Sequence, residues 1–158
     1  MVIDARRIEA LWRRLAPLPG GGRIFGWLLG RAVPYSGSIR PRVLELEPGR
    51  AVVAIRDRRR LRNHFRSLHA LALANVAELA AGLAMTLALP AGTRGIPVRL
   101  EMDYLKKARG RVVADGRASP PRQVTGDTES TATAELSDEA GDVVARGVVI
   151  WQLTPREP

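Results

Sequence analysis

One stretch of the sequence decides the fold: residues 68–89 read LHALALANVAELAAGLAMTLAL. Its main polar members are Asn75, Glu78 and Thr86, so a helix of this sequence is apolar on every side. Eight of its residues are alanine, which is scarcely lipophilic, and an ionisable glutamate at mid-span is costly inside a bilayer. We therefore predict a helix buried in the core of a soluble domain, and no transmembrane segment.

Strand-like segments lie on both sides of this helix. Residues 43–47 and 51–56 flank a turn sequence with proline and then glycine at its centre. A Pro-Ala-Gly sequence at 90–92 ends the helix, and residues 96–104 then alternate between apolar and polar with a period of two. The remaining predicted strands are residues 111–118, 130–136 and 143–153.

This order predicts an α+β fold in which a curved antiparallel sheet wraps one long central helix. A single sheet leaves one side of an all-apolar helix bare, so dimerisation is its natural completion. Residues 4–15 carry one apolar helical face, and a second short apolar stretch follows at 23–33. We assign residues 1–41 to an N-terminal helical extension and residues 42–158 to the main domain. We expect no secretory signal and a cytoplasmic location.

Composition and charge narrow the classes of function. The 158 residues include no cysteine and two histidines, which excludes disulfide scaffolds, thiolate metal sites and a histidine-rich zinc centre. The net charge is +9, and the regional values are +9 for residues 1–62, +4 for 63–111 and −4 for 112–158. Such a field attracts an anion: nucleic acid, an acidic membrane surface or a phosphate-bearing small molecule.

Glu78 is the first candidate for chemistry. A lone carboxylate in an apolar helix is costly unless it is paired, protonated or used, so it is either a structural partner of an arginine or a catalytic group. Asn75 lies one turn earlier on the same face and is placed to orient it. No metal site is expected.

The start of the helix is the second candidate. Asn63 and His69 precede it, with Ser67 at a position suited to a helix cap, and the free N–H groups of the first turn suit a developing oxyanion. Nine residues separate His69 from Glu78, which is about 13.5 Å and a half-integral number of turns. The two ends therefore cannot meet in one chain, and a site that uses both needs two subunits.

The pattern Asn63-x5-His69-Ala70-x7-Glu78, between two strands and a four-strand tail, resembles the hotdog-fold thioesterases. The nearest group is the acyl-CoA thioesterases of the phenylacetate-pathway type and their uncharacterised relatives. The likeness extends over residues 42–153, including segments 94–98, 104–110 and 142–153. Two features depart from the family pattern. Ala70 and Leu71 replace the two glycines that follow the histidine, and Pro97 stands where some relatives have a serine or threonine.

The resemblance implies a hotdog fold, a homodimer or dimer of dimers, and hydrolysis of an acyl-CoA thioester. It assigns Glu78 as general base or nucleophile and the Ala70 N–H as donor to the thioester oxygen. Asn63 would help to place the nucleophilic water, and His69 would orient the helix start. The only cofactor chemistry implied is the coenzyme A moiety of the substrate itself.

A basic cluster suits the phosphates of coenzyme A, because guanidinium and ammonium groups bind phosphate oxygens strongly. We assign it to substrate binding together with Asn75. Its members are Arg58, Arg59, Arg60, Arg62, Lys106, Lys107 and Arg109.

Three alternatives stay open. The first is a non-catalytic acyl-CoA or lipid-binding protein, which the missing glycines favour. The second is a hotdog hydratase or dehydratase, because His64-Phe65 lies fourteen residues before Glu78. The third is a basic scaffold that binds RNA. Aromatic residues make up only 4% of the chain and none lies among the clustered arginines, so no nucleic-acid partner is expected.

Overall fold

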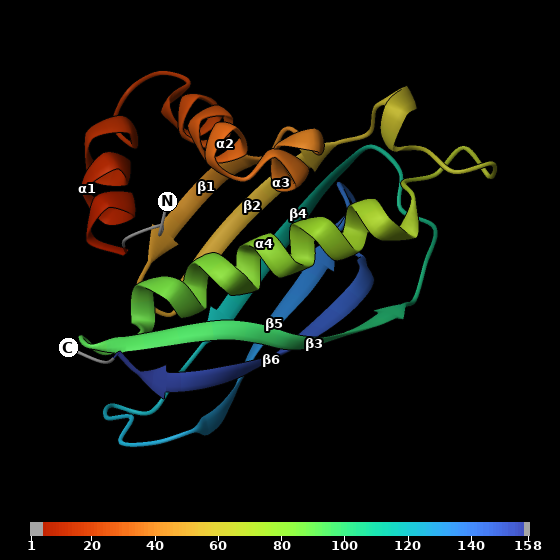
Figure 1. Cartoon of the computed structure of the whole chain (residues 1–158). Helices are drawn as coiled ribbons and strands as arrows, with labels where there is room; N and C mark the ends of the chain where they lie inside the picture. Colours follow the sequence, from red (N-terminus) through yellow and green to blue (C-terminus); the bar gives the residue numbers. More distant parts are fainter. Residues whose placement is uncertain (1–4, 157–158) are drawn as a thin grey trace.

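The computed structural model describes residues 5–156, which form a sheet, a long helix and shorter N-terminal helices (Figure 1). The strands form one antiparallel sheet in the order β1-β2-β4-β5-β6-β3, which confirms the predicted α+β fold. In chain order the elements are α1 (Ala5–Leu15), α2 (Gly21–Ala32), α3 (Pro34–Ser38), β1 (Arg42–Glu47), β2 (Arg50–Arg56), the 3-10 helix η1 (Arg59–Leu61), α4 (Ala70–Ala88), β3 (Thr93–Tyr104), β4 (Arg111–Ala118), β5 (Thr128–Ser137) and β6 (Val143–Pro155).

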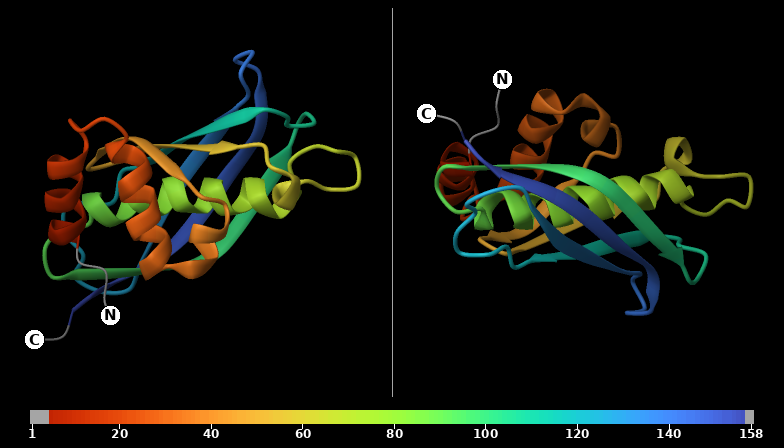
Figure 2. Two further views of the ribbon diagram at one scale, coloured as in Figure 1. Left: turned by 90° about the horizontal axis from the view of Figure 1, so that it is seen from above. Right: turned by 60° about the horizontal axis from the view of Figure 1, so that its bottom comes forward.

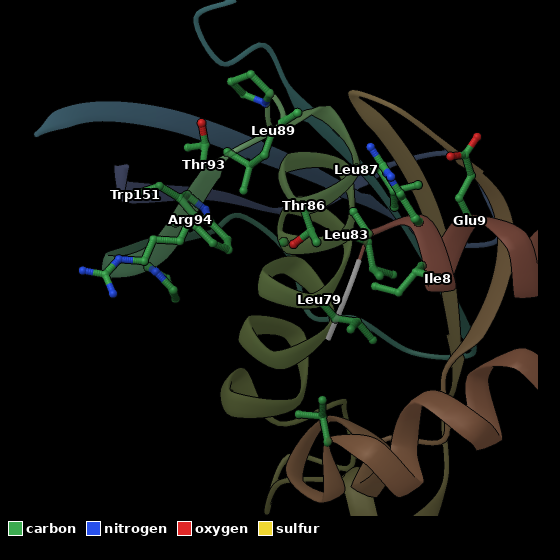
Figure 3. A pocket seen from close by; sticks show the side chains of 18 of the residues that line it. Ile8, Glu9, Leu79, Leu83, Thr86, Leu87, Leu89, Thr93, Arg94 and Trp151 are labelled. Atoms are coloured by element: carbon green, nitrogen blue, oxygen red, sulfur yellow. The ribbon is translucent and has the colours of Figure 1, made fainter. Parts of the chain in front are cut away.

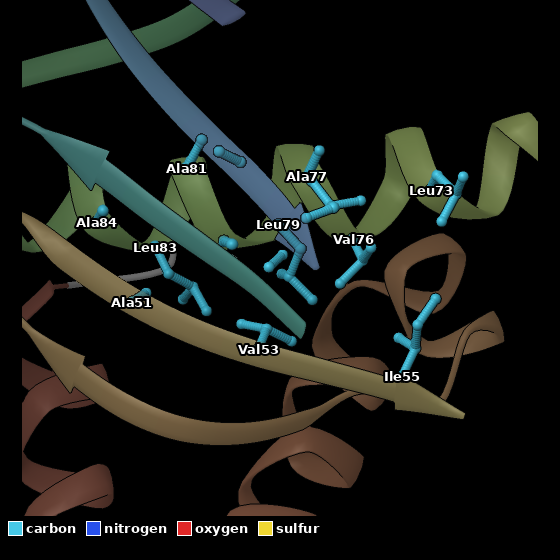
Figure 4. Close-up of a cluster of buried hydrophobic side chains, with 14 of the residues drawn as sticks. Ala51, Val53, Ile55, Leu73, Val76, Ala77, Leu79, Ala81, Leu83 and Ala84 are labelled. Carbon is cyan, nitrogen blue, oxygen red and sulfur yellow. The ribbon is translucent and has the colours of Figure 1, made fainter. Parts of the chain in front are cut away.

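The long helix α4 lies across the concave face of the sheet, which curves around it (Figure 2). Figure 4 shows its aliphatic side chains, among them Val76 and Leu83, opposite Val53 and Ile55 of β2. Of the described helices, only α4 is long and apolar enough to span a membrane, and 67% of that span is buried inside the domain. The prediction of a buried core helix is therefore confirmed.

Small residues let the backbone of α4 approach the sheet closely. A Cβ atom built on Gly116 of β4 would lie 2.3 Å from the carbonyl carbon of Ala80, so only glycine fits there. On β6, a Cβ on Gly147 would lie 3.1 Å from the Cβ of Ala77. The alanines of α4 therefore allow this close packing, because larger side chains would force the helix away from the sheet.

The N-terminal helices pack along β1 and over one side of α4 (Figure 2). Added Cβ atoms at Gly22 and Gly26 of α2 would each lie 2.0 Å from a carbonyl oxygen, those of Val43 and Pro41 respectively, so α2 lies directly on the start of β1. The short helix α3, which the sequence analysis did not separate from α2, contacts it where Gly30 meets Gly37.

The division into residues 1–41 and 42–158 stays a prediction. Phe25 of α2 and Ile39 after α3 are buried in the same hydrophobic cluster as α4, so extension and sheet share a core. Residues 1–4 and 157–158, which that division includes, lie outside the described part of the chain.

Gly116→Ala tests the close approach of helix and sheet. Because the added methyl group meets the backbone of Ala80, we expect the variant to lose about 1–3 kcal/mol of unfolding free energy. Chemical denaturation with an unchanged m-value measures this loss. Gly126→Ala is the matched control, since a Cβ atom there meets nothing within 4 Å. Equal stability of the two variants would contradict the packing argument.

Candidate functional site

His69 caps the N-terminus of α4. Its Nδ1 accepts a hydrogen bond of 3.1 Å from the backbone N–H of Leu71. A neutral imidazole that accepts at Nδ1 carries its proton on Nε2, so this contact assigns the tautomer. The capping residue is thus His69, and the expectation that Ser67 caps the helix is wrong: Ser67 Oγ donates instead to Asn63 Oδ1 over 3.1 Å.

The backbone amide of Ala70 is the free donor of the first helical turn. No residue in the described range 5–156 accepts a hydrogen bond from it, whereas the neighbouring Leu71 amide is taken by His69. The Ala70 carbonyl accepts from the Tyr104 hydroxyl over 3.2 Å. Burial raises the pKa of Tyr104, which keeps this phenol protonated and able to donate. The helix start is therefore fixed from two sides, with one N–H left for a ligand.

Asn63 organises the loop that leads into α4. Its Oδ1 accepts from the backbone amides of Phe65 (2.9 Å) and Ser67 (3.2 Å) as well as from the Ser67 hydroxyl. Its Nδ2 donates to the carbonyl of Leu68 over 3.4 Å. The side-chain oxygen is thus used within the loop, and one amide hydrogen remains to contact a water molecule. This turn-forming role differs from the one predicted for Asn63, although asparagine commonly forms such turns.

Glu78 lies on the wall of a cavity of about 740 Å³ between α4, the N-terminal helices and the start of β3. It is partly buried and forms no ion pair or hydrogen bond with any residue from 5 to 156. Burial raises the pKa of this carboxyl, because desolvation disfavours its charged form. The carboxyl stands beside Gly82: its Oε1 would lie 3.4 Å from a Cβ atom at that position.

The rest of this cavity is mostly apolar. Figure 3 shows Ile8 of α1 facing Leu79 and Leu83 of α4, with Thr93 and Trp151 on the sheet side. The indole N–H of Trp151 is buried without an acceptor among the described residues, which leaves it available as a donor to a bound molecule. No motif in the sequence indicates this group, because its burial depends on tertiary packing. Pro97 lines the same cavity and offers no hydroxyl.

Asn75 forms no hydrogen bond with Glu78. Its Nδ2 donates to the carbonyl of Tyr35 over 3.1 Å, which ties α4 to α3. Its Oδ1 is buried and has no partner within residues 5–156. In the described chain this amide therefore holds the N-terminal helices against α4 and retains one free acceptor.

The candidate residues fall into two groups. Asn63, His69 and Ala70 lie at the start of α4, and none of them lines the cavity that contains Glu78. The sequence-based expectation that the two groups do not converge within one chain agrees with this placement.

The basic residues also divide. Arg62 pairs with Asp57 at 2.6 Å, and Lys106 pairs with Asp138 at 3.0 Å and with Asp142 at 2.5 Å. The other five basic residues of this cluster form no ion pair with a carboxylate of residues 5–156. Arg58 donates to the carbonyl of Ile39, the Lys107 ammonium lies 5.0 Å from the Phe65 ring centre, and Arg59, Arg60 and Arg109 are exposed.

The hydrogen bond from the Leu68 amide to the Ala108 carbonyl, at 2.8 Å, joins the loop after β3 to the loop before α4. Lys107 and Arg109 therefore lie beside the start of α4. Within residues 5–156, no three His, Cys, Asp or Glu side chains are grouped so as to hold a metal ion.

Comparison with known proteins confirms the resemblance to hotdog-fold thioesterases. The model of the family described as "Domain of unknown function (DUF4442)" matches residues 21–153. The solved structure of genomics protein APC5556 is 32% identical, with a TM-score of 0.81, over 96% of this chain and 98% of that one. No functionally curated protein matches the sequence.

Two further structures bear names that point to function. Protein PA5026 of Pseudomonas aeruginosa, a probable thioesterase, has 24% identity and a TM-score of 0.74 over 90% of this chain and 99% of that one. A point mutant of the phenylacetic acid degradation protein PaaI from Thermus thermophilus has 25% identity and a TM-score of 0.64 over 75% of this chain and 97% of that one. The predicted hotdog fold is thus confirmed.

Glu78→Gln should stabilise the protein at neutral pH. In the folded state the pKa of Glu78 is raised above its ordinary value of 4.5. Between the ordinary pKa and the raised one, the native state therefore binds more protons than the unfolded state, and the protein loses stability as the pH rises through this interval. The neutral amide removes this loss. We expect the variant to melt at a higher temperature than wild type at pH 7–8, and the difference to be smaller at pH 4. Each 1 kcal/mol gained in the free energy of unfolding raises the melting temperature by about 2–4 °C.

Thermal unfolding of both proteins between pH 4 and 8 measures this difference. Glu129→Gln, at an exposed carboxylate on β5, is the control and should leave the pH profile unchanged. A destabilised Glu78→Gln at neutral pH would instead indicate that the carboxylate has a stabilising partner.

Proposed function

Since the chain belongs to the family of the domain of unknown function DUF4442 and has the fold of the hotdog thioesterases, we propose that it hydrolyses an acyl-CoA thioester. One observation carries the proposal: Glu78, in an otherwise apolar helix, is partly buried, has no partner among the described residues and lines a cavity of about 740 Å³. Its raised pKa moves the carboxyl towards the range of a general base at neutral pH.

In the proposed reaction, Glu78 takes a proton from a water molecule as the water oxygen attacks the thioester carbonyl carbon. The carbonyl oxygen becomes an oxyanion that the Ala70 amide stabilises. Collapse of the tetrahedral intermediate breaks the carbon–sulfur bond, and the protonated Glu78 returns its proton to the leaving sulfur, so that the coenzyme A thiol and the carboxylic acid are released and Glu78 is again a carboxylate. A backbone N–H remains when glycine is replaced by alanine, so Ala70 retains the donor, with His69 holding the helix start in place.

The proposed site is shared between two subunits. Glu78 and Ala70 are about 12 Å apart along the axis of α4, at 1.5 Å per residue, so each reacting centre takes Glu78 from one subunit and the partner subunit's Ala70. The edge strand β3 supports dimerisation, because within residues 5–156 it pairs only with β6 and it exposes large apolar side chains. These are Ile96, Val98, Leu100 and Tyr104. A homodimer or dimer of dimers completes the proposal.

Exposed basic residues around the helix start suit the phosphates of the coenzyme A moiety. Arg59, Arg60, Lys107 and Arg109 have no carboxylate partner among residues 5–156, in contrast to Arg62 and Lys106. We assign Asn63 to the nucleophilic water through its remaining amide hydrogen, and Asn75 to the substrate through its free oxygen. A cytoplasmic location is part of the same proposal.

The second candidate is a protein that binds acyl-CoA without hydrolysing it. One observation favours it: Leu71, in place of a glycine, is 61% exposed and lies beside the amide that would bind the oxyanion. Its side chain narrows the approach to the Ala70 N–H. The two candidates differ in turnover of a bound thioester.

Glu78→Gln should abolish turnover of a panel of CoA thioesters while retaining binding, because the amide keeps the shape but cannot accept the proton. Thiol release measures turnover, and calorimetry with a non-hydrolysable CoA thioether measures binding. Glu129→Gln is the control and should match wild type. Normal turnover by Glu78→Gln would remove this residue from the mechanism. Binding without turnover in the wild type would instead favour the second candidate.

Mixing two inactive variants tests the shared site. Ala70→Pro removes the proposed donor, and the helix should tolerate it, because proline suits the first helical position and His69 has φ −66° and ψ 142°, which are compatible with a following proline. After random subunit exchange in an equimolar mixture with Glu78→Gln, half of the dimers contain one subunit of each variant. Each of these mixed dimers holds one intact site and one site with both substitutions. Activity should recover to about a quarter of wild type if the sites act independently. No recovery after confirmed exchange would place the site within one chain.

A further inference from the structure

A second cavity, of about 770 Å³, lies on the other side of the α2–α3 pair and shares no lining residue with the Glu78 cavity. Its walls come from α2 and α3, from the segment between α3 and β1, from the first residues of β1 and β4, and from β2 and the segment after it. Among the described residues, the lining includes seven arginines and no acidic residue. These are Arg23, Arg31, Arg40, Arg42, Arg56, Arg58 and Arg111.

These arginines are not neutralised inside the described part of the protein. None of the seven forms an ion pair with a carboxylate of residues 5–156. Arg58 donates to the Ile39 carbonyl at 2.5 Å, and Arg31 stacks on Trp27 with 5.3 Å to the ring centre. Burial lowers the pKa of Arg58, and the charges of Arg40 and Arg60 lower it further. The cavity therefore concentrates uncompensated positive charge.

The sheet places like charges directly opposite each other at this cavity. Arg56 of β2 is the cross-strand partner of Arg111 of β4, a pairing that destabilises a sheet when nothing lies between the charges. Arg42 of β1 pairs with the small Ala54, which also lines the cavity. Three arginine side chains thus leave the same face of the sheet around Ala54, and the neighbouring Ile55 also lines the cavity.

The backbone at Arg40 adds a further energetic cost. Its φ of +49° is in the left-handed region, at the position after a helix where glycine is usual. With arginine in place of glycine, the backbone at position 40 is strained. The side chain also adds a positive charge to a cluster of arginines that repel it. Like-charge pairing and strain at one cavity are typical of a site that binds an anion rather than of a solvated surface.

The shape of the site indicates the class of anion. The arginines converge on one concave volume from one helix, two loops and three strands, so they suit a compact ligand with several phosphate groups better than an extended nucleic-acid strand. Trp27 lines the same cavity and is 60% exposed, and its indole suits stacking with a flat ring. We propose that this cavity binds a nucleoside polyphosphate, at a site separate from the thioester site.

Calorimetry with ATP as the probe tests the proposal, with inorganic triphosphate and adenosine as partial ligands. We expect saturable binding of ATP and of triphosphate and at least ten-fold weaker binding of adenosine. Arg40→Asn/Arg56→Thr should weaken ATP binding at least ten-fold. It should also leave the melting temperature equal to or above that of wild type, because it relieves repulsion and the strain at Arg40. Trp27→Leu should weaken ATP binding more than triphosphate binding.

Arg14→Ser/Arg122→Ser is the control: it removes the same charge from exposed positions outside the cavity and should change ATP binding less than two-fold. Equal losses in both double variants, or no saturable ATP binding by wild type, would overturn the proposal. So would tighter binding of a single-stranded oligonucleotide at the same arginines.

Coenzyme A also carries phosphates and is the second source of the same ligand chemistry. If it displaces ATP and depends equally on Arg40 and Arg56, the cavity serves the thioester substrate and a separate site is excluded. Because ATP binding is measured without turnover, failure of the thioesterase proposal leaves this test unaffected.

Discussion

The enclosure of α4 is the constraint on which the rest of the structure depends. A helix that is apolar on every side must be covered on every side, and a sheet curved around it covers only part of its circumference. The alanines of α4 and Gly116 of β4 bring the sheet to the helix backbone on one side. The N-terminal helices cover a second side through the Asn75 contact to Tyr35, and they leave between themselves and α4 the cavity that contains Glu78.

That cavity explains why a carboxylate is tolerated inside such a helix. Full burial of an unpaired Glu78 would neutralise it, and full exposure would leave its pKa ordinary. A position on the wall of a mostly apolar cavity is intermediate: the charge is disfavoured but water and ligands have access. This placement supports the proposed functional role over a structural ion pair, because no arginine of the described chain pairs with this residue.

Periodic patterns in the sequence predicted the long helix, all the strands and the separation of Glu78 from His69, because these depend on local geometry. Features set by tertiary contacts were not predictable in the same way. The cap on α4 is His69 and not Ser67, since Asn63 holds Ser67 inside the preceding loop. The five-residue helix α3 is too short for a hydrophobic period. Arg58, close in sequence to Arg60, lines a cavity that no local pattern indicates.

The α2–α3 pair connects these observations, because its two faces line the two cavities. Leu29 and Val33 face the cavity of Glu78, while Gly30 and Arg31, adjacent in sequence, face the arginine-rich cavity. The contact of Gly30 with Gly37 permits no side chain between the two helices, so α2 and α3 form one thin, closely packed wall. The two cavities therefore lie on opposite sides of one wall, so the proposed anion and the proposed thioester would bind next to the same two helices. The strongly basic N-terminal region thus belongs to the same structural unit as the candidate active site.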